Sequence, residues 1–220
     1  MRPFLTIVTR CCDRPWYLNR NIESIEQQID QDIEQIYIVD EERKGRYWAN
    51  QEFRNHTHRI DGKYVFIIDD DCRLINKEFV LKLKEGAVGD PRVIMVQTSR
   101  PQIRPKLLPQ SDVWGHFNNI RLHSTNCLCY VVRRDMWQKY VYAFGARAAG
   151  DWHFLKELLA NSSGDKFAWV PGVFSETMQL GRGKKFELKQ NIEGWWMKTV
   201  DGHKIEDVGD GDWRLRLWKK

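Results

Sequence analysis

The sequence contains no apolar run long enough to cross a membrane. A membrane-spanning helix needs about 20 predominantly apolar residues, whereas the apolar stretches of this 220-residue chain are short and its mean hydropathy is −0.60. The first four residues, Met1-Arg2-Pro3-Phe4, also lack the apolar segment of a secretory signal peptide. We therefore expect a cytoplasmic protein whose contact with membranes is at most peripheral.

Cysteine is scarce, and its spacing excludes a zinc-binding arrangement. The five cysteines are Cys11, Cys12, Cys72, Cys127 and Cys129. Cys127 and Cys129 alternate in a strand-like run, so we expect both on one face of that strand. An odd number of cysteines without the paired spacing of zinc ligands indicates reduced thiols in an intracellular protein, most of them small core residues.

The remaining composition is that of a soluble globular protein. Apolar residues make up 42% of the chain and charged residues 30%, which argues against disorder. A length of 220 residues suffices for one domain with a real core. A net charge of +5 fits a partner that carries phosphate, such as a phosphorylated donor, nucleic acid or a lipid headgroup. The ten tryptophans suit stacking on sugars or bases, and they also fill cores.

One stretch organises the chain. Five strand-forming residues, from Tyr64 to Ile68, lead directly into Asp69, Asp70 and Asp71. The apolar run indicates a buried parallel strand, and three adjacent carboxylates must then lie where that strand emerges, at the edge where α/β sheets bind ligands. Two carboxylates one residue apart suit a hard divalent cation such as Mg²⁺ or Mn²⁺. The alternative is an acidic turn that simply ends a strand.

Strand and helix patterns alternate along the chain. We expect strands at 4–9, 35–39, 64–68, 93–97, 126–132 and 167–170, and helices at 15–30, 47–55, 76–86, from 133 onward and at 151–159. The opening strand–helix–strand pattern predicts a parallel pair with a right-handed crossover. A proline-rich loop is expected over 100–112, and short strands around turns within 195–220.

These segments, in this order, resemble the nucleotide-sugar half of a GT-A fold glycosyltransferase of the family 2 type. The resemblance is carried by 4–18, by Ile36-Tyr37-Ile38-Val39-Asp40 and by Val65 to Asp71. The run 125–135 resembles the acceptor-side strand and helix of that family. Gly150-Asp151-Trp152 resembles its Glu-Asp element, with Gly150 where glutamate is usual.

The resemblance covers about 4–170 and implies an α/β fold of the GT-A kind. This fold is Rossmann-like, with a mostly parallel central sheet and flanking helices. We expect a catalytic domain over 1–175, in which 1–100 bind the nucleotide sugar and 101–175 form the acceptor side. The cationic loop and Trp-rich extension over 176–220 would pack on the same domain.

The resemblance also implies roles for the acids of the first half. Asp69 and Asp71 form the DxD pair that would hold Mn²⁺ or Mg²⁺, and Asp69 or Asp70 would reach the ribose. Asp40 matches the acid that holds the nucleobase or ribose, although a strand-end acid that caps a turn is the alternative. Thr9 and Arg14 would flank the base and the phosphates, and for Arg14 a plain surface charge is the alternative.

Asp151 is the candidate general base. An inverting transfer needs one carboxylate to take the proton of the acceptor hydroxyl as the anomeric carbon is attacked. The alternative is an ordinary helix N-cap, a position that aspartate fills well, and both can hold at once.

A basic loop follows the last predicted strand. Its Gln179, Arg182, Lys184 and Lys185 are interrupted by glycines, and Arg182 and Lys184 could close over the diphosphate of the donor. Gln179-x-x-Arg182 faintly resembles an element of processive family members, but the tryptophan that follows it there is missing, so polymer synthesis is not expected. A solvated run of charge is the alternative. His153 or His203 could add a metal ligand, although a lone histidine is more often structural.

Three function classes remain open. The first is metal-dependent, inverting transfer of a sugar from a nucleotide-diphosphate sugar to an acceptor, which is a glycan, a small molecule or a hydroxylated base in DNA. The basic balance of the chain suits DNA, and it suits an anionic membrane surface equally well. The second is nucleotidyl transfer, disfavoured because the loop Arg10-Cys11-Cys12-Asp13-Arg14 lacks glycine. The third is a non-catalytic sugar-binding module, which would not need both the Asp triplet and Asp151.

Overall fold

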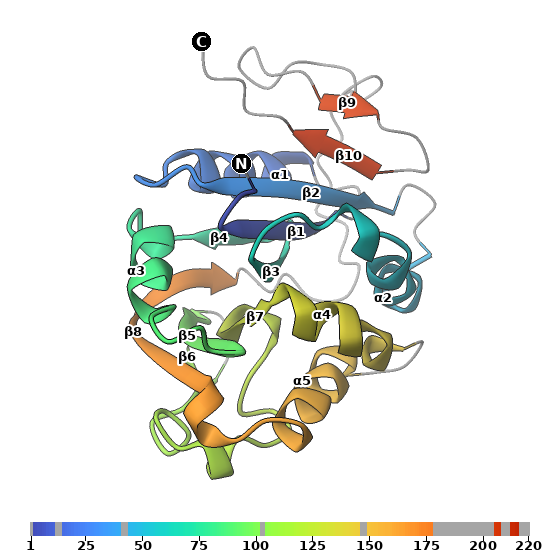
Figure 1. The fold of residues 1–220 in the computed structure, drawn as a ribbon. Helices are drawn as coiled ribbons and strands as arrows, with labels where there is room; N and C mark the ends of the chain where they lie inside the picture. Colours follow the sequence, from blue (N-terminus) through green and yellow to red (C-terminus); the bar gives the residue numbers. More distant parts are fainter. Residues whose placement is uncertain are drawn as a thin grey trace.

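The computed structural model describes residues 2–11, 15–40, 44–101, 104–145, 149–177, 205–207 and 212–215. They form an α/β fold in which one sheet is flanked by helices (Figure 1). The α-helices are α1 (Pro15–Glu26), α2 (Arg46–Asn55), α3 (Phe79–Gly86), α4 (Arg134–Tyr140) and α5 (Gly150–Ala160). The strands are β1 (Leu5–Cys11), β2 (Ile33–Val39), β3 (Tyr64–Asp69), β4 (Cys72–Leu74), β5 (Val93–Ser99), β6 (Leu107–Leu108), β7 (Tyr130–Arg133), β8 (Phe167–Thr177), β9 (Ile205–Asp207) and β10 (Asp212–Leu215). None of the helices in these segments has the length and apolar character that crossing a bilayer requires.

The sheet runs in the order β4-β8-β5-β7-β3-β1-β2-β10-β9, and β6 pairs with β5. β1 lies parallel between β2 and β3, as the strand–helix–strand pattern predicts. β5 and β8 are also parallel, whereas β4, β7 and β10 run antiparallel to their partners, so the sheet is mixed. The α/β class is confirmed. We call the edge where β1, β2 and β3 end the carboxyl edge, and the opposite edge, where they begin, the amino edge.

Helices cover both faces of the sheet (Figure 1). On one face, the ring centroid of Phe79 in α3 lies 5.1 Å from that of Phe66 in β3. Gln28, just after α1, donates a hydrogen bond to the Asn76 carbonyl, just before α3. On the other face, Phe53 of α2 lies 5.7 Å from Trp137 of α4, again between ring centroids. β3 is therefore buried on both faces, as expected for a central parallel strand.

The strand predicted over 126–132 begins later than expected. Residues Cys127–Cys129 form a single 3₁₀ turn, and β7 starts at Tyr130. Asn126 caps this turn, and its side-chain oxygen accepts a hydrogen bond from the Cys129 thiol at 3.1 Å. The expectation that Cys127 and Cys129 share a strand face is wrong, because hydrogen bonds to a nearby Asn side chain compete with strand pairing. The cysteines that the structure describes are buried and form no disulfide with one another, in line with the prediction of reduced thiols.

Several element boundaries also differ from the prediction. The first helix ends at Glu26 rather than at 30. The proline-rich loop contains the short strand β6, and β4 was not predicted at all. β8 continues to Thr177 instead of ending at 170, so it pairs with both β5 and β4.

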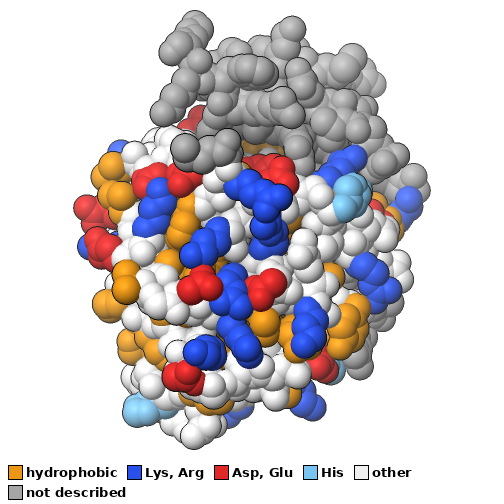
Figure 2. All heavy atoms as spheres, viewed as in Figure 1, with side chains coloured by type: hydrophobic (Ala, Val, Ile, Leu, Met, Phe, Trp, Pro, Cys, Tyr) orange, Lys and Arg blue, Asp and Glu red, His pale blue; other side chains and the backbone are white. Residues whose placement is uncertain are grey.

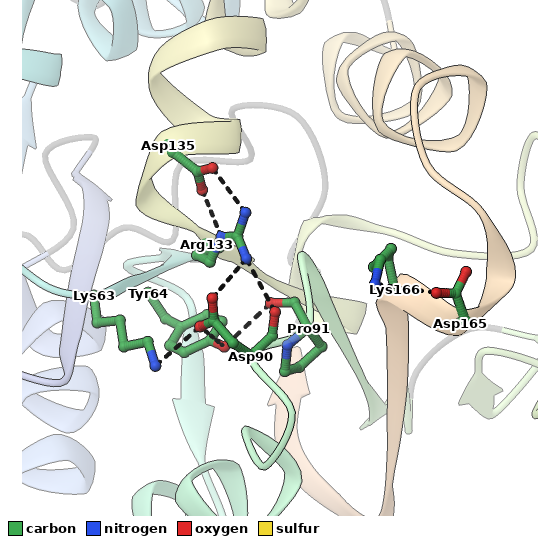
Figure 3. A network of polar contacts seen from close by, with 8 residues as sticks. All are labelled: Lys63, Tyr64, Asp90, Pro91, Arg133, Asp135, Asp165 and Lys166. Atoms are coloured by element: carbon green, nitrogen blue, oxygen red, sulfur yellow. Dashed lines mark hydrogen bonds and ion pairs between the residues drawn. The ribbon is translucent and has the colours of Figure 1, made fainter.

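At the amino edge, charges of both signs connect the strand ends (Figure 3). The ammonium nitrogen of Lys63 lies 2.9 Å from Asp90 Oδ1, and Arg133 Nη1 lies 2.7 Å from Asp90 Oδ2. Arg133 Nε lies 2.7 Å from Asp135 Oδ1. A groove of about 510 Å³ opens here, lined by residues that include Phe4, Lys63 and Arg133. Figure 2 likewise shows Lys and Arg interspersed with Asp and Glu on the face turned to the viewer. These charges offset one another, and the groove lies away from the predicted site.

Candidate active site

Asp69, Asp71 and Cys72 converge where β3 passes into β4. Each offers one ligand atom, and the three atoms lie within 4.8 Å of one another. The Cys72 thiol donates a hydrogen bond to Asp71 Oδ1 at 3.4 Å, and burial, followed by Asp71 and Asp69, raises the pKa of this thiol. Two carboxylate oxygens suit Mg²⁺ or Mn²⁺, and a sulfur donor nearby favours a transition metal. The donor set therefore fits a divalent cation, and the turn brings the predicted pair together.

Arg10 pairs with Asp69 across β1 and β3. The two are register partners, so both side chains leave the sheet on the same face, and Arg10 Nε lies 2.5 Å from Asp69 Oδ1. Arg10 Nη1 donates to Asn50 Oδ1 at 3.4 Å, and the guanidinium carbon lies 5.4 Å from the centre of the Phe53 ring. Burial lowers the pKa of Arg10, but the charges of Asp69 and, among others, Asp151 outweigh it. The Arg10 pKa is therefore raised well above its ordinary value.

Sequence reasoning missed Arg10. We expected residues 10–15 to form a loop, but β1 continues through Cys11. A usable signal was present, because Val8 and Arg10 are two residues apart and must share a face of a strand. Arg10 and Asp69 each stand at the end of a predicted parallel strand, where side chains from neighbouring strands meet.

Asp151 lies in the first turn of α5, within electrostatic reach of the same cluster. Burial raises the pKa of the Cys127 thiol most strongly, Asp69 and Asp151 raise it further, and Arg10 opposes them. The Tyr130 hydroxyl donates a hydrogen bond to the backbone carbonyl of Asp151 at 3.0 Å, which fixes the start of α5 against β7. Asp69 and Asp151, which are far apart in the sequence, thus both raise the pKa of the same buried thiol.

The start of α5 is tightly packed. The N-cap residue is Ala149, with a left-handed φ of 55°, so the alternative role of Asp151 as the N-cap is wrong. A Cβ atom on Gly150 would lie 2.6 Å from Asn50 Nδ2 and 2.6 Å from the carbonyl oxygen of Phe144. The Asn50 side chain of α2 and the Phe144 carbonyl thus leave no room for a side chain at Gly150.

The other described candidates take part in the fold. The Asp40 carboxylate accepts hydrogen bonds from the backbone N–H groups of Lys44, at 2.7 Å, and Gly45, at 2.5 Å. This is the turn-capping role that we considered as the alternative for Asp40. Thr9 is 0% exposed and Asp70 is 1% exposed. The roles of these three residues toward a nucleotide stay predictions.

Several predicted residues lie outside the part of the chain that the structure describes. They are Arg14, Gln179, Arg182, Lys184, Lys185 and His203. β8 ends at Thr177, whose partner in β4 is Cys72, so the chain reaches the carboxyl edge shortly before the cationic stretch begins in the sequence. His153 lies in α5 and is not part of the metal-ligating group found among the described residues.

The α/β fold of this chain is similar to that of solved glycosyltransferase structures. No protein-family model matches the sequence, and no curated protein matches it. Solved structures do match, and they confirm the resemblance at the level of the fold.

Two similar structures are of TarS from S. aureus, residues 1–349. The complex with UDP has 13% identity and a TM-score of 0.62, and the match covers 80% of this chain and 60% of that one. The complex with UDP-GlcNAc has 12% identity and a TM-score of 0.60, with 80% and 58% covered. The mannosyltransferase PcManGT from Pyrobaculum calidifontis, in complex with GDP-Man and Mn²⁺, has 12% identity and a TM-score of 0.50, with 77% and 57% covered. The chain thus spans about 60% of the length of the TarS structure.

Proposed function

We propose that this protein is a metal-dependent, inverting glycosyltransferase that moves a sugar from a nucleotide-diphosphate sugar to an acceptor hydroxyl. The observation that carries the proposal is the convergence of Asp69, Asp71 and Cys72 at the carboxyl edge. It occurs on a fold shared with structures that contain UDP, UDP-GlcNAc, or GDP-Man with Mn²⁺. The division into a catalytic domain over 1–175 and an extension over 176–220 belongs to the same proposal.

Donor binding falls to the carboxyl edge. Asp69 and Asp71 would hold Mn²⁺ or Mg²⁺, which neutralises charge that develops on the departing diphosphate. Asp40, Thr9, Asp70 and Arg14 would contact the nucleotide, and Arg182 and Lys184 would supply further positive charge to the leaving group.

Asp151 would take the proton of the acceptor hydroxyl. As that oxygen bonds to the anomeric carbon, the bond from this carbon to the phosphate oxygen breaks and the nucleoside diphosphate leaves. Attack comes from the face opposite the leaving group, so the configuration inverts. Asn50 connects the segments of the two acids, which supports this arrangement. It accepts a hydrogen bond from Arg10, the ion-pair partner of Asp69, and its side chain lies against Gly150, the neighbour of Asp151. Donor and acceptor must meet between these acids.

The acceptor is a glycan or a small molecule in the leading form of the proposal, and a hydroxylated base in DNA in the alternative form. A DNA acceptor requires contacts to phosphates, so its binding must weaken steeply as salt rises. The affinity for duplex DNA, measured as salt is raised from about 50 to about 200 mM, separates the two forms. Retention that does not change with salt excludes DNA.

The test of the activity is release of nucleoside diphosphate from a panel of nucleotide sugars with Mn²⁺. We expect one sugar to be turned over, with activity lost on chelation and in Asp71→Ala. The matched control is Asp135→Asn at the amino edge, which should keep its activity. Turnover that survives both chelation and Asp71→Ala contradicts the metal role, and a lack of binding or turnover across the whole panel contradicts the proposed function.

A further inference from the structure

One buried asparagine contacts both halves of the candidate site. Asn50 lies in the middle of α2 and is 5% exposed. Its side-chain oxygen accepts a hydrogen bond from Arg10 Nη1 at 3.4 Å, and Arg10 forms the ion pair with Asp69. Its side-chain nitrogen donates a hydrogen bond to the carbonyl oxygen of Gly145 at 3.3 Å. A single amide group thus connects the end of β1 with the segment that precedes α5 in the sequence.

The same side chain also lies against the first residue of α5. A Cβ atom on Gly150 would be 2.6 Å from Asn50 Nδ2, so the start of α5 approaches α2 more closely than a side chain there would allow. Asp151 is the next residue, and its backbone carbonyl accepts a hydrogen bond from the Tyr130 hydroxyl of β7 at 3.0 Å. The start of α5 therefore has two fixed contacts, one to β7 and one to α2.

α2 is itself anchored at the carboxyl edge. The Asp40 carboxylate, directly after β2, accepts hydrogen bonds from the two backbone N–H groups just before the helix. One turn after Asn50, Phe53 packs against the Arg10 guanidinium, and its ring centroid lies 5.0 Å from that of Phe144. In Figure 1, α2 lies between the ends of β1 and β2 and the helices α4 and α5. α2 thus contacts the donor side and the acceptor side of the candidate site at once.

Asparagine is an unusual residue at this position. It is a weak helix former, because its side chain competes for backbone hydrogen bonds, and a buried amide is costly unless its polar atoms have partners. Both the oxygen and the nitrogen of Asn50 have such partners, and these come from two separate segments. Departures from local preference of this kind are expected at functional or strained sites.

We propose that Asn50 is a positioning residue for the transfer reaction, and that it fixes the start of α5, which carries the candidate base Asp151, relative to Asp69. The inference rests on the proposed function and adds to it a residue that neither binds the donor nor exchanges a proton. A misplacement of about 1 Å in a reacting group can cost about 100-fold in rate. Asn50 therefore affects the chemical step through Asp151. Arg10 keeps its ion pair when Asn50 is replaced, so the donor side stays in place.

The experiment measures release of nucleoside diphosphate, in the presence of Mn²⁺, from the nucleotide sugar that the panel identifies. Asn50→Ala removes both hydrogen bonds, and Asn50→Leu removes them while it keeps a side chain of similar size. We expect both variants to lower kcat by about 10–100-fold with the KM for the nucleotide sugar within about threefold, because only the chemical step is misaligned. Asn55→Ala is the matched control on the same helix. Asn55 is exposed and its side chain donates a hydrogen bond to Glu52, so kcat should change less than about twofold.

A double variant separates positioning from a general loss of structure. If Asn50 acts through Asp151, its replacement has little effect once the base is gone. Asn50→Ala combined with Asp151→Asn should therefore be as slow as Asp151→Asn alone, within about threefold, because residues that act as a unit are not additive. A merely structural role would lower the rate further, by the factor seen in Asn50→Ala alone.

Hydrogen exchange gives a readout that does not depend on activity. The amide of His153 donates a hydrogen bond to the Ala149 carbonyl at 3.0 Å, at the start of α5. In Asn50→Ala, the amides of 153–155 should exchange about tenfold faster, whereas those of β3 should keep their rates. An equal rise in both elements would indicate global destabilisation and would overturn the positioning role.

Each remaining outcome has a definite meaning. An unchanged kcat in the Asn50 variants, or losses that add in the double variant, overturns the positioning role and leaves the proposed function standing. A higher KM with an unchanged kcat assigns Asn50 to donor binding and overturns the positioning role as well. A folded, unmodified protein that neither binds nor turns over any nucleotide sugar of the panel overturns the proposed function and this inference together. Where one of Asn50→Ala and Asn50→Leu does not fold, the other is held to the same result.

Discussion

The two edges of the sheet use the same residue types in different ways. At the amino edge, Asp90 lies between Lys63 and Arg133, and Asp135 pairs with Arg133 (Figure 3). The two aspartates and Lys63 are half exposed, whereas Arg133 is 23% exposed. At the carboxyl edge, Asp69 and Asp71 converge within 4.8 Å of Cys72, and Arg10 is the cation with which Asp69 forms an ion pair.

This difference distinguishes a structural network from a candidate site. Exposed ion pairs contribute little to stability and need no ligand. Carboxylates that converge on one point can hold a cation together, and perturbed charges gather at functional sites. The groove of about 510 Å³ lies at the amino edge, where the charges balance. A search for a groove alone would therefore have suggested the wrong edge.

The largest contrast should appear in the chemistry. Asp151→Asn at the carboxyl edge should lower the rate of sugar transfer by about 10²–10⁴-fold, because a general base contributes on that scale. Binding of Mn²⁺ with a nucleoside diphosphate should remain, as read by thermal shift. Asp135→Asn at the amino edge is the matched control and should change the rate less than about twofold, as expected for a surface substitution away from the site. Full activity in Asp151→Asn would remove this residue from the mechanism.

The second-largest difference between the two edges should appear in the unfolding free energy. Asp69→Asn leaves Arg10 without its carboxylate partner. Removal of one partner of a buried ion pair lowers the unfolding free energy by up to about 3–5 kcal/mol. Since this pair is one-fifth to one-third exposed, we expect about 2 kcal/mol after allowance for solvent screening. Asp90→Asn should cost less than about 1 kcal/mol. Urea unfolding without added metal measures both, and an equal loss in the two variants would mean that the edges do not differ in this respect.

Packing gives a third contrast. Gly150→Ala places a Cβ atom 2.6 Å from Asn50 Nδ2 and from the Phe144 carbonyl oxygen, and overpacking of this kind costs about 1–3 kcal/mol. At Gly164, just before β8, the nearest atom would be 3.5 Å away, in ordinary contact. Gly164→Ala should therefore stay within about 0.5 kcal/mol of the unmodified protein. Thermal unfolding compares the two, and a stable Gly150→Ala would show that α2 yields to a side chain.

The smallest expected effect is a loss of stability at low pH. The hydrogen bond from Lys63 lowers the pKa of Asp90, and that from Arg133 lowers the pKa of Asp135, against the opposing effect of burial. A lowered folded-state pKa contributes stability that is present above the unfolded value of about 3.9 and lost as the pH falls through the folded value.

The unfolding free energy should therefore drop below about pH 4 by less than about 1 kcal/mol from this network. Asp90→Asn should be slightly less stable than the unmodified protein at neutral pH, and this difference should vanish as the pH falls through the folded-state pKa, so the acid-induced drop is smaller in the variant. Measurement of the melting temperature from neutral to acid pH tests this. A drop that is identical in Asp90→Asn would assign the acid sensitivity to other carboxylates.

Much of the fold follows from local pattern. The buried stretch at Tyr64 to Asp69, its parallel partners and the helices between them were predictable, because strand and helix periodicities differ and the crossover rule limits the topology. β4 was not predictable, since a three-residue strand that starts inside the acidic cluster exists only through its pairing with β8. The turn at Cys127–Cys129 depends on the capping side chain of Asn126, which outweighs the strand-like pattern.

The site was predictable only in part. The pair Asp69 and Asp71 could be recognised because adjacent acids after a buried strand must emerge together. The role of Cys72 and the contact of Arg10 with Asp69 require the strand register, which no single segment contains. The close approach of Asn50 to Gly150 joins residues one hundred positions apart, so only the folded chain reveals it.

The alignment of Arg10 with Asp69 also makes the site a check on the folding of the chain itself. Adjacent positions of a strand face opposite sides of the sheet, so a shift of β1 by one residue would turn the guanidinium toward α1 and leave the aspartate alone. A misaligned chain therefore loses this ion pair. An insertion or deletion within β1 should accordingly cost both the pair and the packing of the core, because β1 is buried on both faces.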